Sequence, residues 1–302
     1  MNYNLGNQMI RPLLVELNII SEETIQLFSQ GTRDNPSLAV FRDSNSGVIF
    51  IDDFYVGDSE YSQGSYKMDT RRLTKMHTGI RDYTASLDLN RRITDYSQFY
   101  VGKTIVDFGC GTGAFLRHVH KDTIHSYGVE LQDSYRDLLA SHDIHCYSSI
   151  ESLENNSIDT IFLFHSFEHL PDPLEKLKLF RQKLKPSGKL IIEVPHANDF
   201  LISYLKVPSF IDFTLWSQHL ILHTRYSLQS FLNHSGFTDI TISGVQRFPL
   251  SNHLKWLLDA QPGGHQSTLS LIDNQQLTNA YTMTLAGLDA TDTLLAVATL
   301  EQ

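Results

Sequence analysis

Hydrophobic and polar residues follow two alternating patterns between residues 103 and 243. Short apolar runs of strand length are followed by longer stretches in which apolar residues recur at helical spacing. The runs that predict strands are 104–108, 126–130, 144–147, 158–164, 189–194 and 238–243. Helices are expected between them at 114–120, 134–141, 174–184 and 227–234. This alternation is typical of a parallel sheet with helices on both faces.

The chain before this region follows a different pattern. Two apolar segments, 40–42 and 48–51, flank the polar turn 44–47, and together they predict a β-hairpin. Apolar residues between Leu87 and Tyr96 then recur at near-helical spacing, which predicts a helix leading into the central region. We therefore expect a small N-terminal module followed by a lead-in helix.

The chain after this region ends in another apolar run, 293–299, which predicts a last strand. Pairing of this strand with 238–243 would make 249–291 an insertion between two edge strands. The insertion would start at the end of the sheet where ligands bind in open α/β folds. We expect it to cover the substrate; the alternative is a packing element that stiffens the edge of the sheet.

Composition narrows the class of protein. The 302 residues are 41% hydrophobic and 19% charged, which is typical of a globular protein. The formal charge of −10 disfavours nucleic acid as a partner. No apolar stretch approaches the ~20 residues of a membrane span, and the first twenty residues lack the features of a signal peptide, so we expect a cytoplasmic protein. The two cysteines, Cys110 and Cys146, do not have zinc-site spacing, and no metal is expected.

Candidate chemistry centres on a glycine-rich turn directly after the strand 104–108. Gly109, Gly111 and Gly113 allow positive φ angles and close approach of a ligand to the backbone. Asp107 precedes the turn, and Glu130 ends the next strand, where a carboxylate can accept hydrogen bonds from ribose hydroxyls. The glycine spacing is GxGxG, whereas nicotinamide enzymes carry GxGxxG, so a dinucleotide enzyme is disfavoured.

Several segments resemble class I S-adenosylmethionine-dependent methyltransferases, in the expected order. They are IVDFGCGTGAFL at 105–116, YGVEL at 127–131, FHSFEHLPDP at 164–173, LKPSGKLIIEVP at 184–195 and QHLILHTRYSLQSFLNHSGF at 218–237. The last one is similar to a segment of members that act on sugars and other small metabolites. The resemblance implies an α/β fold with a Rossmann-like, seven-stranded, mostly parallel sheet whose last strand is antiparallel. The resemblance covers about 105–243; with the patterns on either side of it, we expect four parts: an N-terminal module with its lead-in helix at 1–100, the cofactor-binding core at 101–248, the insertion at 249–291 and the last strand at 292–302.

The resemblance also implies a cofactor site for S-adenosylmethionine, with S-adenosylhomocysteine as the product. Asp107 would hold the amino group, Glu130 the ribose, and Leu131 would pack on the adenine. The positions carried over are Asp107, Gly109, Cys110, Gly111, Gly113, Glu130, Leu131, Ile150, Glu151 and His165.

Histidines are the expected catalytic bases, because a sugar hydroxyl does not ionise unaided at neutral pH. Of the 14 histidines, we assign catalysis to His196 or His219, with His165 a third candidate that also shapes the cofactor pocket. The alternative for His196 is a hydrogen bond to a loop carbonyl. Glu168 and His169 are expected to have a scaffolding role. The chain departs from the family pattern at Gln218, where relatives usually carry glutamate.

The predicted function is methyl transfer to a small molecule, foremost a sugar or nucleotide-linked sugar in polysaccharide or secondary-metabolite biosynthesis. Alternatives are O-methylation of a phenol or quinone-like ring and a non-catalytic cofactor-binding or partner-binding domain. Transfer to oxygen, nitrogen or carbon stays open, as does a homodimer. The pairs Arg71–Arg72 and Arg91–Arg92 could bind a phosphate, but we expect solvated helix faces there.

Overall fold

A seven-stranded sheet forms the centre of the computed structural model, which describes residues 10–52, 54–57, 62 and 78–301. The strand order is β10-β11-β8-β7-β4-β5-β6. All neighbouring pairs are parallel except those of β11, which is antiparallel to both β10 and β8. The strands are β4 (Thr104–Phe108), β5 (His125–Val129), β6 (His145–Tyr147), β7 (Ile158–Phe164), β8 (Leu184–Pro195), β10 (Phe237–Val245) and β11 (Thr293–Leu300). The predicted fold class is confirmed.

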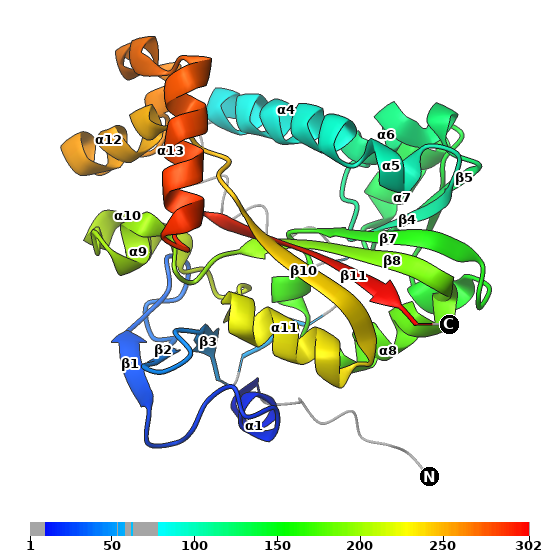
Figure 1. Ribbon diagram of the computed structural model, residues 1–302, viewed down its shortest axis with the longest axis horizontal. Helices are drawn as coiled ribbons and strands as arrows, with labels where there is room; N and C mark the ends of the chain where they lie inside the picture. The colour runs from blue at the N-terminus through cyan, green and yellow to red at the C-terminus, as the bar shows by residue number, and fades with distance from the viewer. Residues whose placement is uncertain (1–9, 53, 58–61, 63–77, 302) are drawn as a thin grey trace.

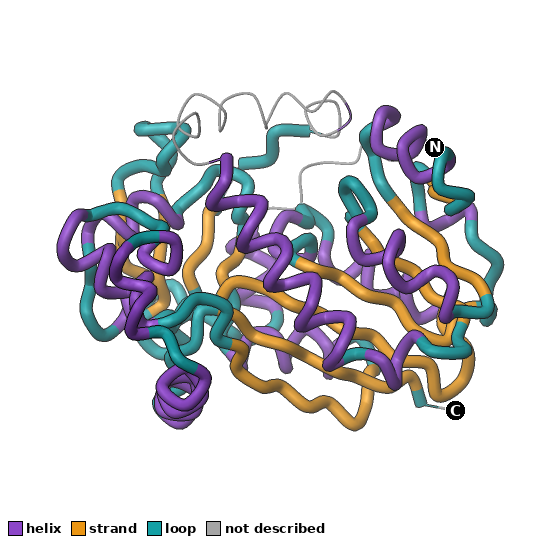
Figure 2. The backbone as a smooth tube through the Cα atoms, turned by 90° about the horizontal axis from the view of Figure 1, so that it is seen from above, coloured by secondary structure: helices purple, strands orange, loops and turns teal. Residues whose placement is uncertain are grey.

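Helices cover both faces of this sheet (Figure 1). On one side lie α4 (Thr78–Asp95), α5 (Ser97–Tyr100) and α6 (Ala114–Val119), and their core includes Tyr96, Phe115 and Phe162. On the other side lie α8 (Pro173–Lys183) and α11 (Arg225–His234), which bury Phe180 and Phe231. Helix α7 (Asp133–Ala140) connects β5 and β6. In the view from above, α4 runs diagonally across the strands (Figure 2).

The N-terminal part forms a second, four-stranded sheet of order β1-β2-β3-β9. Helix α1 (Ile10–Glu16) precedes its strands β1 (Ile25–Ser29), β2 (Val40–Asp43) and β3 (Ile49–Ile51). The predicted hairpin is confirmed, because β2 and β3 pair in antiparallel register. Strand β9 (Ile221–Leu222) comes from the segment between β8 and α11 and pairs with β3. The N-terminal sheet is therefore completed by the central part of the chain.

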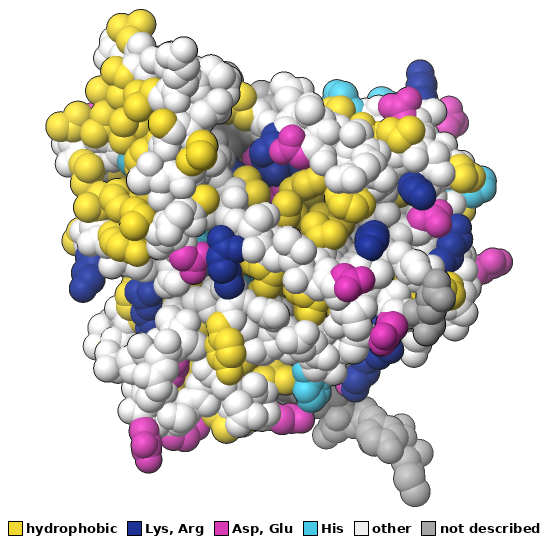
Figure 3. Space-filling view, viewed as in Figure 1, with side chains coloured by type: hydrophobic (Ala, Val, Ile, Leu, Met, Phe, Trp, Pro, Cys, Tyr) yellow, Lys and Arg dark blue, Asp and Glu magenta, His cyan; other side chains and the backbone are white. Residues whose placement is uncertain are grey.

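The segment between β10 and β11 contains α12 (Leu250–Asp259), the short helices η4 (Gly264–Gln266) and η5 (Thr268–Ile272), and α13 (Gln275–Gly287). It lies with α9 (Phe200–Ser203) and α10 (Pro208–Thr214) beyond the carboxyl ends of the parallel strands (Figure 1). Trp256 of α12 is buried against Leu201 and Val207. Apolar side chains gather on the surface over α10, α12 and α13 (Figure 3). Among the described residues, none of the helices combines the length and apolar character needed to cross a bilayer.

Candidate active site

The glycine-rich turn after β4 has the backbone conformation that its sequence predicts. Gly109, Gly111 and Gly113 have φ angles of 73°, 56° and 67°. A Cβ on Gly113 would lie 2.1 Å from Leu139 Cδ2, so this glycine lets α6 approach α7 closely. A Cβ on Gly111 would meet nothing within 4 Å, so its space is open. One glycine thus serves packing, and the other leaves bare backbone accessible.

Two carboxylates lie beside this turn. Asp107 is 3% exposed at the end of β4, and burial raises its pKa to about 7, opposed by the charge of Arg92 and reinforced by that of Glu130. Glu130 Oε2 accepts a hydrogen bond of 2.8 Å from the Gly111 N–H, and its Oε1 accepts one of 2.9 Å from the Gln132 N–H. Glu130 therefore ties the glycine turn to the loop before α7.

The other predicted cofactor residues differ in their exposure. Leu131 is 37% exposed, whereas Ile150 is buried in the main hydrophobic core and Glu151 is exposed. Cys110 Sγ lies 3.9 Å from Cys146 Sγ, which belongs to β6. The structure thus brings Asp107, Cys110 and Glu130 to the turn, while the side chain of Ile150 points into the protein.

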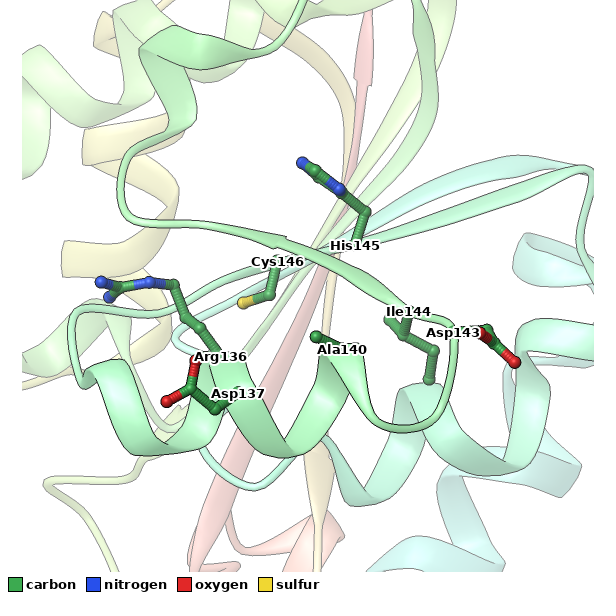
Figure 4. A pocket seen from close by; sticks show the side chains of 7 residues that line it. All are labelled: Arg136, Asp137, Ala140, Asp143, Ile144, His145 and Cys146. Atoms are coloured by element: carbon green, nitrogen blue, oxygen red, sulfur yellow. The ribbon is translucent and has the colours of Figure 1, made fainter.

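A surface cavity of about 470 Å³ lies at the outer edge of the sheet, between α7 and β6 (Figure 4). Its lining residues are Arg136, Asp137, Ala140, Asp143, Ile144, His145 and Cys146. The thiol of Cys146 connects this cavity to the glycine turn, since it lies next to the thiol of Cys110. Because the catalytic histidine candidates are not among the lining residues, we assign no reaction to this cavity.

A buried ionic cluster connects α4 to the sheet. Glu193 of β8 is fully buried and accepts hydrogen bonds from Arg91 Nη1 at 2.7 Å, from Arg92 Nη2 at 2.6 Å and from the Tyr96 hydroxyl. The Arg91 and Arg92 side chains are only 20% and 14% exposed. The expected solvated helix face at these arginines is therefore wrong. The pair Arg71–Arg72 lies outside the described residues.

His165 lies directly beside the glycine turn. It follows β7 with a φ of 54°, and its neighbour Ser166 donates a hydrogen bond of 2.9 Å to the carbonyl of Phe108. His165 Nδ1 is 3.5 Å from Glu168 Oε1, while its Nε2 is buried and has no hydrogen-bond partner among the described residues. Burial and the charge of Arg247 lower the pKa of His165, although Glu168 opposes this shift. The imidazole is therefore neutral at pH 7 and can accept a proton.

Glu168 is the centre of a cluster whose members come from two separate segments of the chain. Its side chain is fully buried, and both carboxylate oxygens lack a hydrogen-bond partner in the described part of the chain. The ring of His169 packs at 5.1 Å from that of His219, and burial lowers the pKa of His219 to about 3. Only the EH pair at 168–169 and the QHL segment at 218–220 could have indicated this cluster, but nothing in the sequence shows that they meet.

His196 lies in a different environment from His165 and His219. Its Nδ1 is 3.0 Å from the carbonyl of Thr291, and its Nε2 is 3.9 Å from Asp289 Oδ2. Burial lowers the pKa of His196 to about 4. The ring is therefore hydrogen-bonded to a loop carbonyl, which is the alternative to catalysis that the sequence left open for His196. Its catalytic role stays a prediction.

Comparisons with known proteins find relatives of this chain among methyltransferases. The model of the methyltransferase-domain family matches residues 81–242. The chain is 26% identical over 165 residues to a ubiquinone biosynthesis O-methyltransferase of Coxiella burnetii, an alignment that covers 50% of this chain and 70% of that protein. It is 28% identical over 122 residues to phosphoethanolamine N-methyltransferase 2 of Caenorhabditis elegans, covering 36% and 27% of the two chains. A methyltransferase structure from Archaeoglobus fulgidus superposes with a TM-score of 0.49 at 20% identity, over 71% of this chain and 93% of that one.

Proposed function

The chain belongs to the methyltransferase-domain family of S-adenosylmethionine-dependent enzymes, and from this premise we propose that it methylates a hydroxyl group of a small molecule. The observation that carries the proposal is the neutral, half-buried His165. Its Nε2 has no hydrogen-bond partner among the described residues, and its Nδ1 faces the carboxylate of Glu168 beside the glycine turn.

The residues at the glycine turn fit the cofactor. Open space at Gly111 accommodates a ligand against bare backbone, and Asp107 is a buried carboxylate suited to a cationic amino group. Glu130 supplies carboxylate oxygens for the ribose hydroxyls, in competition with its present backbone donors. Leu131 is the exposed apolar side chain nearest to this glutamate in sequence, and we assign it to the adenine. The bound cofactor supplies an activated methyl group.

The proposed base is His165, acting with Glu168. Nε2 takes the proton of the acceptor hydroxyl, and the carboxylate then stabilises the imidazolium through Nδ1. This division of roles resembles that of other His–carboxylate pairs, in which the carboxylate orients the ring. His219 contributes to the same cluster, whereas the position of His196 near Thr291 and Asp289 favours a positioning role.

We propose a sugar or nucleotide-linked sugar as the acceptor. The resemblance of residues 218–237 to sugar-modifying members supports this choice, as does the concentration of imidazole and carboxylate groups around Glu168. A phenol or quinone-like ring is the second candidate, because the similar Coxiella burnetii protein is a ubiquinone biosynthesis O-methyltransferase. Such a ring needs an apolar pocket, which the segment 245–260 could supply; its Trp256, however, is buried among Leu201 and Val207.

Radiolabelled cofactor, offered with panels of nucleotide sugars and of phenols, tests the acceptor class. We expect transfer to a member of the sugar panel. His165→Asn should lower kcat by about 10²–10⁴-fold, because the base acts in the chemical step, and should change the Kd for S-adenosylhomocysteine much less. The matched control is His118→Asn, an exposed histidine of α6. Full activity of His165→Asn would show that another group is the base.

A further inference from the structure

Glu168, His169 and His219 are three side chains of the kinds that bind metal ions, and they come together from two separate segments of the chain. Glu168 and His169 belong to η3 (Phe167–His169), and His219 precedes β9. The N–H of Leu220 donates a hydrogen bond of 2.9 Å to the Glu168 carbonyl, which holds the two segments together. One ligand atom from each of Glu168, His169 and His219 lies within 4.8 Å of the other two. From this arrangement we propose that these three residues bind one divalent transition-metal ion.

The burial of Glu168 is the first argument. Its side chain is fully buried, and neither oxygen accepts a hydrogen bond from the described residues. A buried carboxylate without hydrogen bonds is strongly disfavoured unless a cation compensates it. The nearest side-chain nitrogens are imidazole atoms, with His165 Nδ1 at 3.5 Å and His169 Nε2 at 4.0 Å from Oε1. A metal ion bound between the carboxylate and the imidazoles would supply the missing positive charge.

The orientation of the two imidazoles is the second argument. His169 Nδ1 lies 2.7 Å from the Gln218 carbonyl, and His219 Nδ1 lies 3.3 Å from the Thr214 carbonyl. A carbonyl oxygen only accepts, so each Nδ1 carries the hydrogen and each neutral ring keeps its lone pair on Nε2. Metal-binding histidines are commonly oriented in this way, by a backbone carbonyl that fixes the tautomer. Both rings therefore have the tautomer that a metal ion requires.

The ligand set is the third argument, because it selects the class of ion. Two imidazole nitrogens and one carboxylate oxygen suit Zn²⁺, Co²⁺ or Fe²⁺ rather than Mg²⁺ or Ca²⁺, which prefer oxygen ligands. Ligand atoms at about 2.1 Å from a tetrahedral ion lie about 3.4 Å apart, so the side chains need to move by only about 1 Å. Three protein ligands leave at least one coordination position open.

The competing explanation is an ion pair between Glu168 and a protonated histidine. The two rings of His169 and His219 lie 5.1 Å apart, so protonation of both would place two cations side by side. His165 could carry the single proton that an ion pair needs, and it faces the same oxygen of Glu168. An ion pair needs no metal ion, whereas the proposed site binds one. Metal binding to the wild-type protein therefore distinguishes the two explanations.

The role of the ion rests on the proposed function, but its binding does not. In the proposed reaction, the open coordination position would take an oxygen of the acceptor close to His165. Coordination lowers the pKa of a hydroxyl group and would make its proton easier for His165 to remove. No metal is expected from the sequence, because its zinc-type spacings are absent and the two halves of this site are about fifty residues apart.

The test uses the full chain after dialysis against a chelator. Titration with CoCl₂ should produce the visible absorption of a coordinated Co²⁺ ion, with an end point of one ion per chain, and ZnCl₂ should abolish it. Glu168→Gln, His169→Ala and His219→Ala should each weaken binding at least tenfold. His118→Ala is the matched control, because His118 Nδ1 also lies 2.8 Å from a carbonyl, that of Ala114, but lies outside the three-residue cluster. Absence of the Co²⁺ absorption in wild type, or its retention in all three variants, would overturn the proposal.

A second measurement needs no variant and so does not depend on variant folding. Diethylpyrocarbonate modifies accessible imidazoles, and the modified positions are mapped by mass spectrometry. ZnCl₂ should protect His169 and His219 and leave His118 reactive; equal modification with and without Zn²⁺ would contradict the site. Binding of S-adenosylhomocysteine and methyl transfer are measured on the same samples. Loss of the metal signal with intact transfer would refute only this inference, whereas metal binding without any transfer would refute only the proposed function.

Discussion

At the scale of single residues, Asp107 makes cofactor binding sensitive to pH. Burial raises the pKa of this carboxyl group to about 7, and Arg92 opposes the shift while Glu130 adds to it. The ionised form is the one that binds a cationic amino group, so the affinity for S-adenosylhomocysteine should rise with pH. With a pKa of about 7, the ionised fraction goes from about one tenth at pH 6 to about nine tenths at pH 8, so we expect an increase of up to about tenfold in affinity. Titration calorimetry across this range measures it.

Asp107→Asn is the control for this pH dependence. The variant should bind more weakly at pH 8 and show a flat profile between pH 6 and pH 8, because the titrating group is gone. The same slope in the variant and in wild type would assign the pH dependence to another group.

Gly111 and Gly102 form a matched pair for testing the glycine turn. Both have positive φ angles, 56° and 65°, and a Cβ on either would meet nothing within 4 Å. Each alanine variant should therefore lose about 1 kcal/mol of unfolding free energy, through backbone strain alone. Only Gly111→Ala should weaken binding of S-adenosylhomocysteine, by tenfold or more, because its methyl group would enter the proposed ligand space. Equal affinities in the two variants would show that the cofactor does not bind on this side of the turn.

The sequence predicts which residues lie close together only where they belong to one continuous motif. Asp107, the glycines and Glu130 lie within 24 positions of one another, and two adjacent strands bring them together. Glu168 and His219 meet only because the segment before β9 folds back against η3. No local pattern encodes that contact.

At the scale of elements, the cluster around Glu193 attaches α4 to the sheet. Glu193→Gln should lower the free energy of unfolding by about 3 kcal/mol, because it removes the charge that Arg91 and Arg92 share at a buried position. Urea denaturation measures the loss. The matched control is Glu175→Gln on α8, whose pair with Lys178 is about half exposed and should contribute at most about 0.5 kcal/mol. Similar losses in both variants would contradict a special role for the buried cluster.

The elements of the central sheet could be predicted because each one has a local signal. Apolar runs mark the strands, and Asp107-to-Gly113 or Ser235–Gly236 mark the turns between strand and helix. Strand β8 begins earlier than expected, at Leu184, because Leu184 already pairs with Ile158. The register then shifts before Lys189 pairs with Thr160, and Ser187, which lies in this irregular stretch, has a positive φ. The pairing of β9 with β3 joins residues about 170 positions apart, and a two-residue strand has no periodicity to reveal it.

At the scale of the whole molecule, the N-terminal part and the methyltransferase core share one hydrophobic core. Leu14 of α1 and Phe50 of β3 belong to the same buried cluster as Val106 of β4 and Phe231 of α11. The Tyr226 hydroxyl adds a hydrogen bond of 3.1 Å to the carbonyl of Asn18. The expected boundary near residue 100 stays a prediction about sequence organisation, but the shared core argues that the two parts unfold together.

This shared core predicts a single unfolding transition that responds as a whole to a change in the N-terminal part. Leu14→Ala leaves a cavity at a fully buried position, so the entire transition should shift by about 2–5 kcal/mol. Leu27→Ala, at a position of β1 that is 51% exposed, should shift it by less than about 1 kcal/mol. Far-ultraviolet circular dichroism and tryptophan fluorescence should give coincident curves in urea, because a single transition removes both the secondary structure and the packing around Trp216 and Trp256. Leu14→Ala could instead produce a separate early transition and leave the rest of the unfolding curve unchanged. The N-terminal part would then be an independent folding unit, and it would not help to hold the segment that carries His219.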